Sequence, residues 1–337
     1  MVTCVRKTEC LLGLALILSS TLLVAADETV KFEKRADCIR VLIGGTNFTT
    51  YYFGSNSSKP YMSPLRSAQG TILTRGFPMR TDIPGERHDH PHHRALFFAH
   101  GDINGIDFWG EQQLSPAAQT AGGKFYSSED LPKGRTVFRR LDEAKSNGRS
   151  GTLQAEFDLA GTDGNSLATE IQEYTFRGDN STRVIDCTFT LIADKGVAVK
   201  LGDTKEGTFA IRVVNGLTEP GLKMVNSEGK VGVDQIWGKR ANWVDYSGEV
   251  DGESVGIAIF DNPANIKHPT YWHARDYGLF AVNPFGEHDF YHDPKRDGSV
   301  TIPRGHSLTL RYRVLIHHGD ATEAQVAEAW RRYAQGQ

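Results

Sequence analysis

The stretch 182-TRVIDCTFTLIAD-194 decides the fold, because apolar and polar side chains alternate along most of its length. Alternation with a period of two places the apolar side chains on one face of an extended strand and the polar ones on the other. β-Branched and aromatic residues dominate the stretch, and these residue types are enriched in strands. We therefore predict a strand with one buried face.

The same pattern recurs along the chain and predicts an all-β fold. It appears in 152-TLQAEFDLAG-161, 167-LATEIQEYTFRG-178, 208-TFAIRVV-214, 255-VGIAIFDN-262 and 308-LTLRYRVLIHH-318. Each stretch is short and bounded by Gly, Asn or Asp, and no regular strand–helix alternation of the parallel α/β kind occurs. We predict one large antiparallel β-sandwich domain over residues 27–337, although two smaller β domains remain an alternative.

One helix is expected at the C-terminal end, in 322-TEAQVAEAWRRYAQ-335. Thr322 and Gln325 have the spacing of a capping box, in which two side chains satisfy backbone N–H groups at a helix start. Val326, Trp330 and Tyr333 fall on one stripe of a helix with 3.6 residues per turn. The sequence therefore predicts a helix that packs through this stripe.

Residues 1–26 have the pattern of a secretory signal peptide. A short basic region is followed by the apolar run 11-LLGLALILSSTLLVAA-26, which is short for a membrane span and ends in small residues. The pattern predicts a secreted or periplasmic protein without stable membrane insertion, and an uncleaved anchor is the alternative. The net charge of −3 offers no basic surplus for nucleic acid. Whether Cys38 and Cys187 form a disulfide stays open.

Five of the twelve histidines lie in the stretch 85-GERHDHPHHRALFFAHGDINGIDFW-109. Pro91 predicts a loop over residues 85–93, and a strand can begin at Arg94 with Leu96, Phe98 and His100 on the same face. Three interpretations stay open for the histidines. They could bind a divalent metal ion, carry protons in acid–base chemistry, or form a polar loop without chemistry.

Two further polar clusters follow, each beside a predicted strand. In 201-LGDTKEGTFAIRV-213, Glu206 could act as a base that Lys205 keeps ionised, or it could belong to a solvated turn. In 265-NIKHPTYWHARDYGLFAVNPFGEHDF-290, His273 and Arg275 face one way and Trp272 faces the other. Aromatic rings beside planar donors suit sugars, although Trp272 could equally be a core residue.

We expect the three clusters to meet on one face of the sandwich and form a single site. The acid–base candidates are His90, His93, His100, Glu206 and His273. The candidates for holding substrate are Arg80, Arg94, Lys205, Trp272, Arg275 and Asn283. If the site holds one divalent metal ion, the candidate ligands are His90, His92 and His93.

The three clusters together resemble a secreted bacterial family labelled PmoA-like or "methane oxygenase PmoA". The resemblance rests on DHPHHRALFFAHGDINGIDFW, GDTKEGTFAIRV and HPTYWHARDYGLFAVNPFG, with KPYMSPLRSAQGTILTRGFPMR upstream. It implies a β-sandwich similar to the galactose-mutarotase-like supersandwich and a role in carbohydrate breakdown. It does not imply the membrane methane monooxygenase, since that subunit crosses the membrane several times and this chain has one short apolar segment.

The function that follows is a carbohydrate-active enzyme working on a glycoside or oxidised sugar. Lyases, epimerases and hydrolases all need a base, an acid and a cation that stabilises charge, and the clusters contain all three types. A non-catalytic carbohydrate-binding module is the first alternative, because it needs the aromatic and arginine contacts only. A redox metalloenzyme is the second, and it rests on the histidines and the family label.

Overall fold

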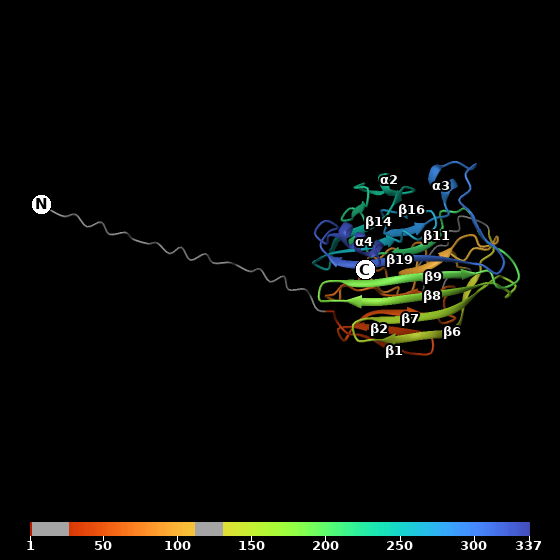
Figure 1. Cartoon of the computed structure of the whole chain (residues 1–337), viewed down its shortest axis with the longest axis horizontal. Coiled ribbons are helices and arrows are strands. Elements are labelled where there is room, and N and C mark those ends of the chain that lie inside the picture. The colour runs from red at the N-terminus through yellow and green to blue at the C-terminus, as the bar shows by residue number, and fades with distance from the viewer. Residues whose placement is uncertain (2–26, 112–130) are drawn as a thin grey trace.

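Two antiparallel sheets pack face to face and form a β-sandwich (Figure 1). The computed structural model describes Met1 and residues 27–111 and 131–337. The predicted signal peptide therefore lies almost wholly outside the described residues. The all-β class, the antiparallel sheets and the helix near the C-terminus are confirmed, whereas a single domain over residues 27–337 stays a prediction.

The larger sheet has nine strands in the order β1-β2-β3-β4-β5-β11-β17-β16-β13. Their bounds are β1 Val30–Lys34, β2 Cys38–Ile43, β3 Thr46–Tyr52, β4 Tyr61–Met62, β5 Leu96–His100, β11 Gly207–Arg212, β17 Leu279–Asn283, β16 Thr270–Ala274 and β13 Arg240–Ala241. Strands β5, β11, β17 and β16 lie side by side near one end of this order. Segments far apart in the sequence thus become neighbours, as the three polar clusters require.

The second sheet has eight strands in the order β12-β14-β15-β19-β9-β8-β7-β6. Their bounds are β12 Lys223–Asn226, β14 Trp243–Val250, β15 Glu253–Asp261, β19 Ser307–His318, β9 Arg183–Ile192, β8 Ser166–Gly178, β7 Gly151–Ala160 and β6 Arg135–Ser146. A small pair joins β10 Val199–Leu201 to β18 Val300–Ile302. All six stretches with alternating side chains form strands of the two large sheets, as predicted.

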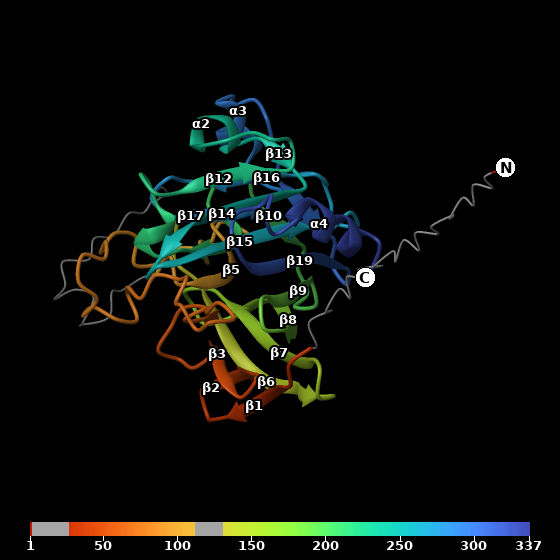
Figure 2. The ribbon, with the colours of Figure 1, turned by 90° about the vertical axis from the view of Figure 1, so that its left-hand side faces the viewer.

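Helices are short and lie at the periphery. The 3-10 helix η1 spans Asn215–Leu217, α2 spans Val233–Ile236, α3 spans Glu287–Tyr291 and α4 spans Val326–Ala334. Helices α2 and α3 lie at the same end of the molecule in both views (Figures 1 and 2). The ring of Trp237, which follows α2, meets that of Phe290 in α3 at a centroid distance of 5.5 Å.

The predicted C-terminal helix exists, but the predicted capping box was wrong. Helix α4 begins at Val326, and Gln325 precedes it in a left-handed conformation with no side-chain cap. The backbone N–H of Thr322 instead donates to Asp320, in a turn ahead of the helix. Val326 and Tyr333 are buried against the outer surface of the eight-stranded sheet, with Trp330 partly buried beside them, so the predicted stripe is confirmed.

The core lies between the sheets, where side chains of both sheets form one continuous apolar cluster. From β5 and β11 it takes Leu96, Phe98, Phe209 and Ile211. Cys187 of β9 belongs to the same cluster, and both it and Cys38 are buried free thiols. The possible disulfide is therefore absent between these two residues.

Every residue of β5, β11, β16 and β17 is buried. Because successive side chains point to opposite faces, these strands must be covered on both sides. One side meets the eight-stranded sheet. The other side, called the outer face below, carries a second apolar cluster of Tyr61, Phe97, Ala99, Trp109, Ala210, Leu279 and Ala281.

Candidate functional site

The candidate site is built on the outer face of β5, β11, β17 and β16. Phe97, Ala210, Ala281 and His273 stand opposite one another on these four strands. The two alanines keep the middle of this row low, because a methyl group projects little from the sheet. Larger side chains from the loop over residues 75–95 and from Trp109 can therefore approach the sheet here.

Arg75 fixes the conformation of the histidine-rich loop over residues 85–93. Its guanidinium is almost completely buried and donates to the carbonyl oxygens of Asp89 at 2.8 Å and His90 at 2.8 Å, and more weakly to that of His93 at 3.2 Å. A fourth contact joins it to the carboxylate of Asp89 at 2.6 Å. The N–H groups of a single guanidinium thus hold the loop in its conformation. Sequence analysis missed Arg75, and no spacing in the sequence marks it.

Arg212 of β11 connects this loop to the sheet. It donates to the Asp89 carboxylate at 2.6 Å and to the Nδ1 atom of His93 at 3.2 Å, and it lies over the ring of Tyr277 at 4.7 Å. Burial by itself would raise the pKa of the Asp89 carboxyl. The hydrogen bond with His90 and the charges of the two arginines outweigh burial and hold that pKa well below its usual range.

His93 is neutral and its tautomer is fixed. An arginine can only donate, so the Nδ1 atom that contacts Arg212 must accept and the proton must sit on Nε2. Burial, followed by the nearby His92 and Arg212, lowers the pKa of His93 well below its ordinary value. The ring therefore stays an uncharged N–H donor at any pH near neutrality.

Three rings form a parallel stack over the outer face. His90 lies between His93, at a centroid distance of 4.8 Å, and Tyr277, at 5.4 Å, with all planes within a few degrees of parallel. His92 meets His93 edge-on at 4.4 Å. His90 is the open member of the stack, with a quarter of its side chain exposed.

This arrangement does not support the interpretation of the histidines as metal ligands. Ring nitrogens bind metals in the plane of the ring, so the parallel rings of His90 and His93 direct their lone pairs side by side instead of towards one point. Within residues 27–111 and 131–337, no group of three or more His, Cys, Asp or Glu side chains is arranged to hold a metal ion. The described geometry gives the three candidate ligands no common centre.

A buried salt bridge holds Trp109 at the edge of the site. The Nζ atom of Lys59 donates to the carbonyl oxygen of Trp109 at 2.6 Å and lies 3.3 Å from Glu111. Arg94 clasps the same glutamate through two hydrogen bonds of 2.7 and 2.8 Å. Burial would raise the pKa of Glu111, but the charges of Arg94 and Lys59 lower it to about 2. Arg94 was expected to hold substrate, and the structure directs it to Glu111.

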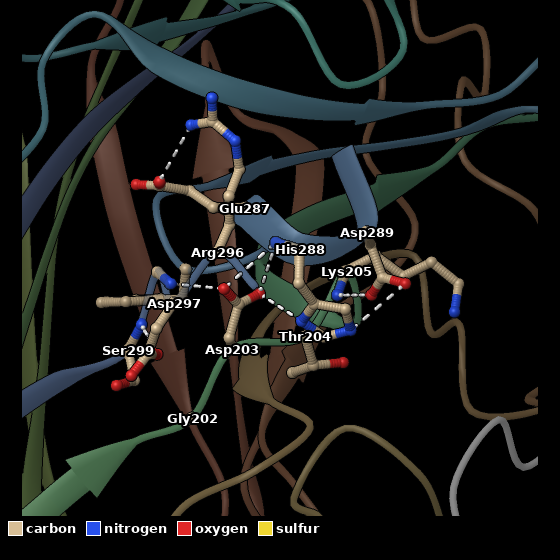
Figure 3. Close-up of polar contacts among 12 residues, drawn as sticks. Gly202, Asp203, Thr204, Lys205, Glu287, His288, Asp289, Arg296, Asp297 and Ser299 are labelled. Atoms are coloured by element: carbon tan, nitrogen blue, oxygen red, sulfur yellow. Dashed lines mark hydrogen bonds and ion pairs between the residues drawn. The ribbon is translucent and has the colours of Figure 1, made fainter. Parts of the chain in front are cut away.

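The turn before β11 is pinned to α3 by an aspartate–histidine pair (Figure 3). The carboxylate of Asp203 accepts from the Nδ1 atom of His288 at 2.7 Å and from the backbone N–H of the same residue. The neighbouring Asp289 accepts from the backbone N–H of Lys205 at 2.8 Å. These contacts fix the position from which Lys205 and Glu206 project.

Glu206 lies at the edge of the site, with 18% of its side chain exposed and the Nζ atom of Lys205 at 3.6 Å. Burial raises the pKa of its carboxyl, and Lys205 offsets part of the effect. The charges of Asp107 and His90 also act on that pKa, which places Glu206 within electrostatic reach of both. A carboxylate with a raised pKa is a stronger base than an ordinary one.

His273 occupies the same face, and both of its ring nitrogens are used. Its Nδ1 donates to the carbonyl oxygen of Lys205 at 2.9 Å, and its Nε2 accepts from the Nε of Arg275 at 3.1 Å. Burial, followed by the charge of Arg275, lowers the pKa of His273 to about 3. The ring therefore connects the backbone of Lys205 to the side chain of Arg275 and positions both, and neither of its nitrogens is left to exchange a proton with a substrate.

Four expected site residues lie elsewhere. Trp272 points into the core between the sheets, so it cannot stack on a sugar, and its Nε1 donates to Ala241. His100 faces the same side, with its Nε2 against the carbonyl oxygen of Gly202 at 2.9 Å. The Asn283 amide bonds the backbone, and Arg80 is exposed and paired with Asp82.

The structure thus gathers His90, His93, Glu206, Lys205, His273 and Arg275 on one face. Sequence analysis missed Arg75, Asp89, Trp109, Glu111, Lys59 and Tyr277 as members of the same cluster. Asp89 and Trp109 were within the quoted histidine stretch, and Tyr277 was within the third cluster, so proximity in sequence was the only available signal.

A model of a family of unknown function, DUF6807, matches residues 38–331. The chain belongs to this family. The resemblance to the PmoA-like methane oxygenase family was therefore wrong, because the match over most of this DUF6807 chain indicates a different family and nothing indicates the expected one. No curated protein matches the chain.

Several solved structures resemble this DUF6807 chain at low sequence identity. A galactose mutarotase-like protein from Clostridium acetobutylicum matches with a TM-score of 0.42 and 9% identity, over 87% of this chain and 99% of its own. A putative aldose 1-epimerase from Escherichia coli K12 matches with a TM-score of 0.32 and 11% identity, over 86% and 99%. A polysaccharide lyase matches with a TM-score of 0.33 and 12% identity, over 88% and 34%. Neither the site nor its chemistry depends on these matches.

Proposed function

We propose that the outer-face site binds a carbohydrate and transfers a proton on it, as a lyase, epimerase or hydrolase does. One observation carries the proposal. His93, a neutral donor with a fixed tautomer, stacks on His90, and the charge of His90 also acts on Glu206, a carboxyl with a raised pKa at the edge of the same site. A base and an uncharged donor at one place are the parts that proton transfer needs.

Each group has a role that follows from its protonation state. Glu206 takes the proton in its ionised form, which Lys205 at 3.6 Å favours. His93 donates a hydrogen bond from Nε2 to a substrate oxygen and does not act as a cationic acid, because its pKa lies well below neutrality.

A carbohydrate-binding module is the alternative, and the occupied nitrogens of His273 favour it. A module needs no base, so a raised pKa at Glu206 would have no purpose in it. The redox metalloenzyme gains no support from the described residues, because the stacked rings of His90 and His93 do not converge on one point. The decisive comparison is therefore between binding alone and binding with turnover.

A panel of glycosides, uronic acids and keto-glycosides should be screened for binding and turnover with the whole protein. Glu206→Gln keeps the size of the side chain and removes its basicity. We expect it to retain binding and to lower turnover by about 10²–10⁴-fold. Glu249→Gln, an exposed position on β14, is the matched control. Turnover that survives in Glu206→Gln would contradict the proposed mechanism, and binding without any turnover would favour the module.

We also propose that the protein is exported. The support is the basic and apolar pattern of residues 1–26, which the structure does not describe beyond Met1. No helix among the described residues is long and apolar enough to cross a membrane. N-terminal sequencing of the protein recovered from the periplasm or medium should begin near Asp27. Recovery of an exported protein that still starts at Met1 would contradict cleavage.

A further inference from the structure

In the part of the chain that the structure describes, His93 and Trp109 each bury an unpartnered ring nitrogen on the outer face. Both side chains are buried, with exposed fractions of 1% and 2%. The Nε2 atom of His93 and the Nε1 atom of Trp109 nevertheless have no hydrogen-bond partner among the described residues. A buried polar group without a partner costs about 1–3 kcal/mol, so two of them in adjacent rings require an explanation.

Both atoms are donors. The indole Nε1 can only donate, and the contact between Arg212 and Nδ1 places the proton of His93 on Nε2. The two rings meet edge-on at a centroid distance of 5.7 Å, and both pack on Phe97. Two adjacent rings on one apolar residue therefore each carry an N–H donor, and no acceptor of the described chain serves either of them.

The positions of both rings are fixed by neighbouring polar groups. Lys59 holds the carbonyl oxygen of Trp109, and the carboxylate of Asp107 accepts from its backbone N–H at 2.7 Å. Arg212 holds the opposite edge of His93. Rigid donors of this kind cannot turn to find another partner. Preorganised N–H pairs of this kind stabilise an oxygen that gains negative charge in a reaction.

We propose that His93 Nε2 and Trp109 Nε1 form a subsite for one sp² oxygen of an oxidised sugar, either the carbonyl of a keto-sugar or the carboxylate of a uronic acid. This inference rests on the proposed function of the same site. A hydroxyl group fits less well, because it must also donate its own proton, and the Nδ1 acceptor of His93 is already used by Arg212.

The subsite completes the proton transfer assigned to Glu206. The base takes a proton from the carbon next to the carbonyl or carboxyl group. The electron pair of the broken C–H bond moves towards the sp² oxygen, which becomes an enolate oxygen held by the two N–H groups. The proton on the Glu206 carboxyl then returns to carbon, or elimination follows: the enolate electron pair forms a C=C bond, the C–O bond at the next carbon breaks with its own electron pair, and the departing oxygen takes the proton.

The test compares three methyl hexosides that differ only in oxidation, in both the gluco and galacto series. They are the neutral glycoside, its 3-keto form and its uronic acid, and each is titrated into the whole protein with ¹⁵N-labelled tryptophan. We expect the indole N–H signal of Trp109 to move downfield with an oxidised sugar and to stay in place with the neutral one. We also expect the oxidised sugar to bind at least about tenfold more tightly. The oxidised form that moves the signal and binds more tightly shows whether the subsite takes a ketone oxygen or a carboxylate oxygen.

Trp109→Phe removes the donor and keeps a ring on Phe97. It should lower the affinity for the oxidised sugar about tenfold and leave that for the neutral sugar unchanged. Trp243→Phe, a buried tryptophan packed on the opposite sheet, is the matched control. If Trp109→Phe does not fold, the wild-type spectrum still decides, since one of the five indole signals must respond to oxidised sugars alone.

The outcomes separate the two proposals. Equal binding of neutral and oxidised sugars, with turnover that still depends on Glu206, would overturn the subsite and leave the proposed function standing. Binding of an oxidised sugar with no movement of any indole signal would also overturn the subsite. Failure of all the sugars to bind would overturn the proposed function, and the subsite with it.

Discussion

Two buried histidines on the outer sides of the two sheets have opposite partners. His93 accepts a hydrogen bond from Arg212, so it is neutral, and its second nitrogen has no partner within residues 27–111 and 131–337. His317 of β19 contacts the carboxylate of Asp245 at 2.8 Å through Nε2 and the carbonyl oxygen of His318 at 3.2 Å through Nδ1. Both of its nitrogens are used.

The difference separates a structural histidine from a functional one. Burial works to lower the pKa of His317, but the hydrogen bond and charge of Asp245 outweigh it and raise that pKa above its ordinary value. The same burial, with Arg212 as neighbour, leaves His93 neutral. A buried histidine whose contacts are complete stabilises the fold, whereas the unused donor of His93 is the group that we propose contacts a ligand.

Among the changes that test this comparison, removing Arg212 from the outer face should lower the free energy of unfolding most. In Arg212→Met, Asp89 loses one of its two arginines and the Nδ1 atom of His93 loses its donor. Breaking a buried ion pair from one side costs about 3–5 kcal/mol, and we expect a value near the top of that range. Unfolding in urea measures the loss, and the exposed Arg311→Met is the control. A loss below about 1 kcal/mol would show that Arg75 alone can hold the loop.

Replacing Asp245, the partner of His317, tests the buried histidine of the eight-stranded sheet. In Asp245→Asn the imidazole can give up its proton instead of remaining an unpaired cation, so we expect a smaller loss of about 3 kcal/mol near pH 6. The folded-state pKa of His317 is raised, so its stabilisation is complete below about pH 6.5 and is lost as the pH rises through the folded pKa. Unfolding free energies from pH 5 to pH 9 should decline more steeply in the wild type than in the variant. A parallel decline in both would assign the pH dependence to another group.

A buried carboxyl between the sheets gives the comparison a third case. The Oε1 atom of Glu170 accepts from the Nε2 of Gln172 at 2.6 Å, and Gln172 accepts from Tyr51 and Tyr174. Burial raises the pKa of Glu170 to about 7. A carboxyl with a raised pKa stabilises the fold at low pH, and that stability is lost as the pH rises from about 4.5 to about 7.

Glu170→Gln should therefore remove this loss. The amide keeps an acceptor for Gln172 and never ionises, so we expect a gain of up to about 3 kcal/mol at pH 8 and almost none at pH 4. Thermal or urea unfolding at both pH values measures it. Glu156→Gln on the neighbouring strand β7, where the side chain is partly exposed and paired with Arg140, is the control. Destabilisation at both pH values would mean that the carboxyl has a partner that the amide cannot replace.

The strands could be predicted from sequence, but not the side of each central strand that would face the core. Alternation correctly placed His100 with Leu96 and Phe98, and Trp272 opposite His273. Strands β5 and β16 are covered on both sides, however, so apolar residues occupy both faces and alternation cannot tell the core from the outer face. For this reason His100 and Trp272 were expected in the site, and the structure places them on the other side of the sheet.

The candidate site was partly predictable for a related reason. Clusters of His, Arg and Glu are visible in a sequence, and they mark the right strands. Which nitrogen of a histidine is used depends on partners far away in the chain, such as Arg212 for His93 and Lys205 for His273. Arg75 acts through backbone carbonyl oxygens, which every residue has, so nothing in the sequence can show its targets.

The smallest expected effect concerns Arg80, which lies outside both regions. Its guanidinium is more than half exposed and pairs with Asp82 two residues away. Exposed pairs of this kind contribute little, because water screens the charges and both side chains lose freedom when they meet. Arg80→Ala should therefore leave unfolding, sugar binding and turnover without measurable change. A clear loss of sugar binding in this variant would extend the site to the loop beyond Phe77 and restore the role that the sequence predicted for Arg80. A loss of stability alone would not do so, which is why binding and unfolding must be measured on the same preparation.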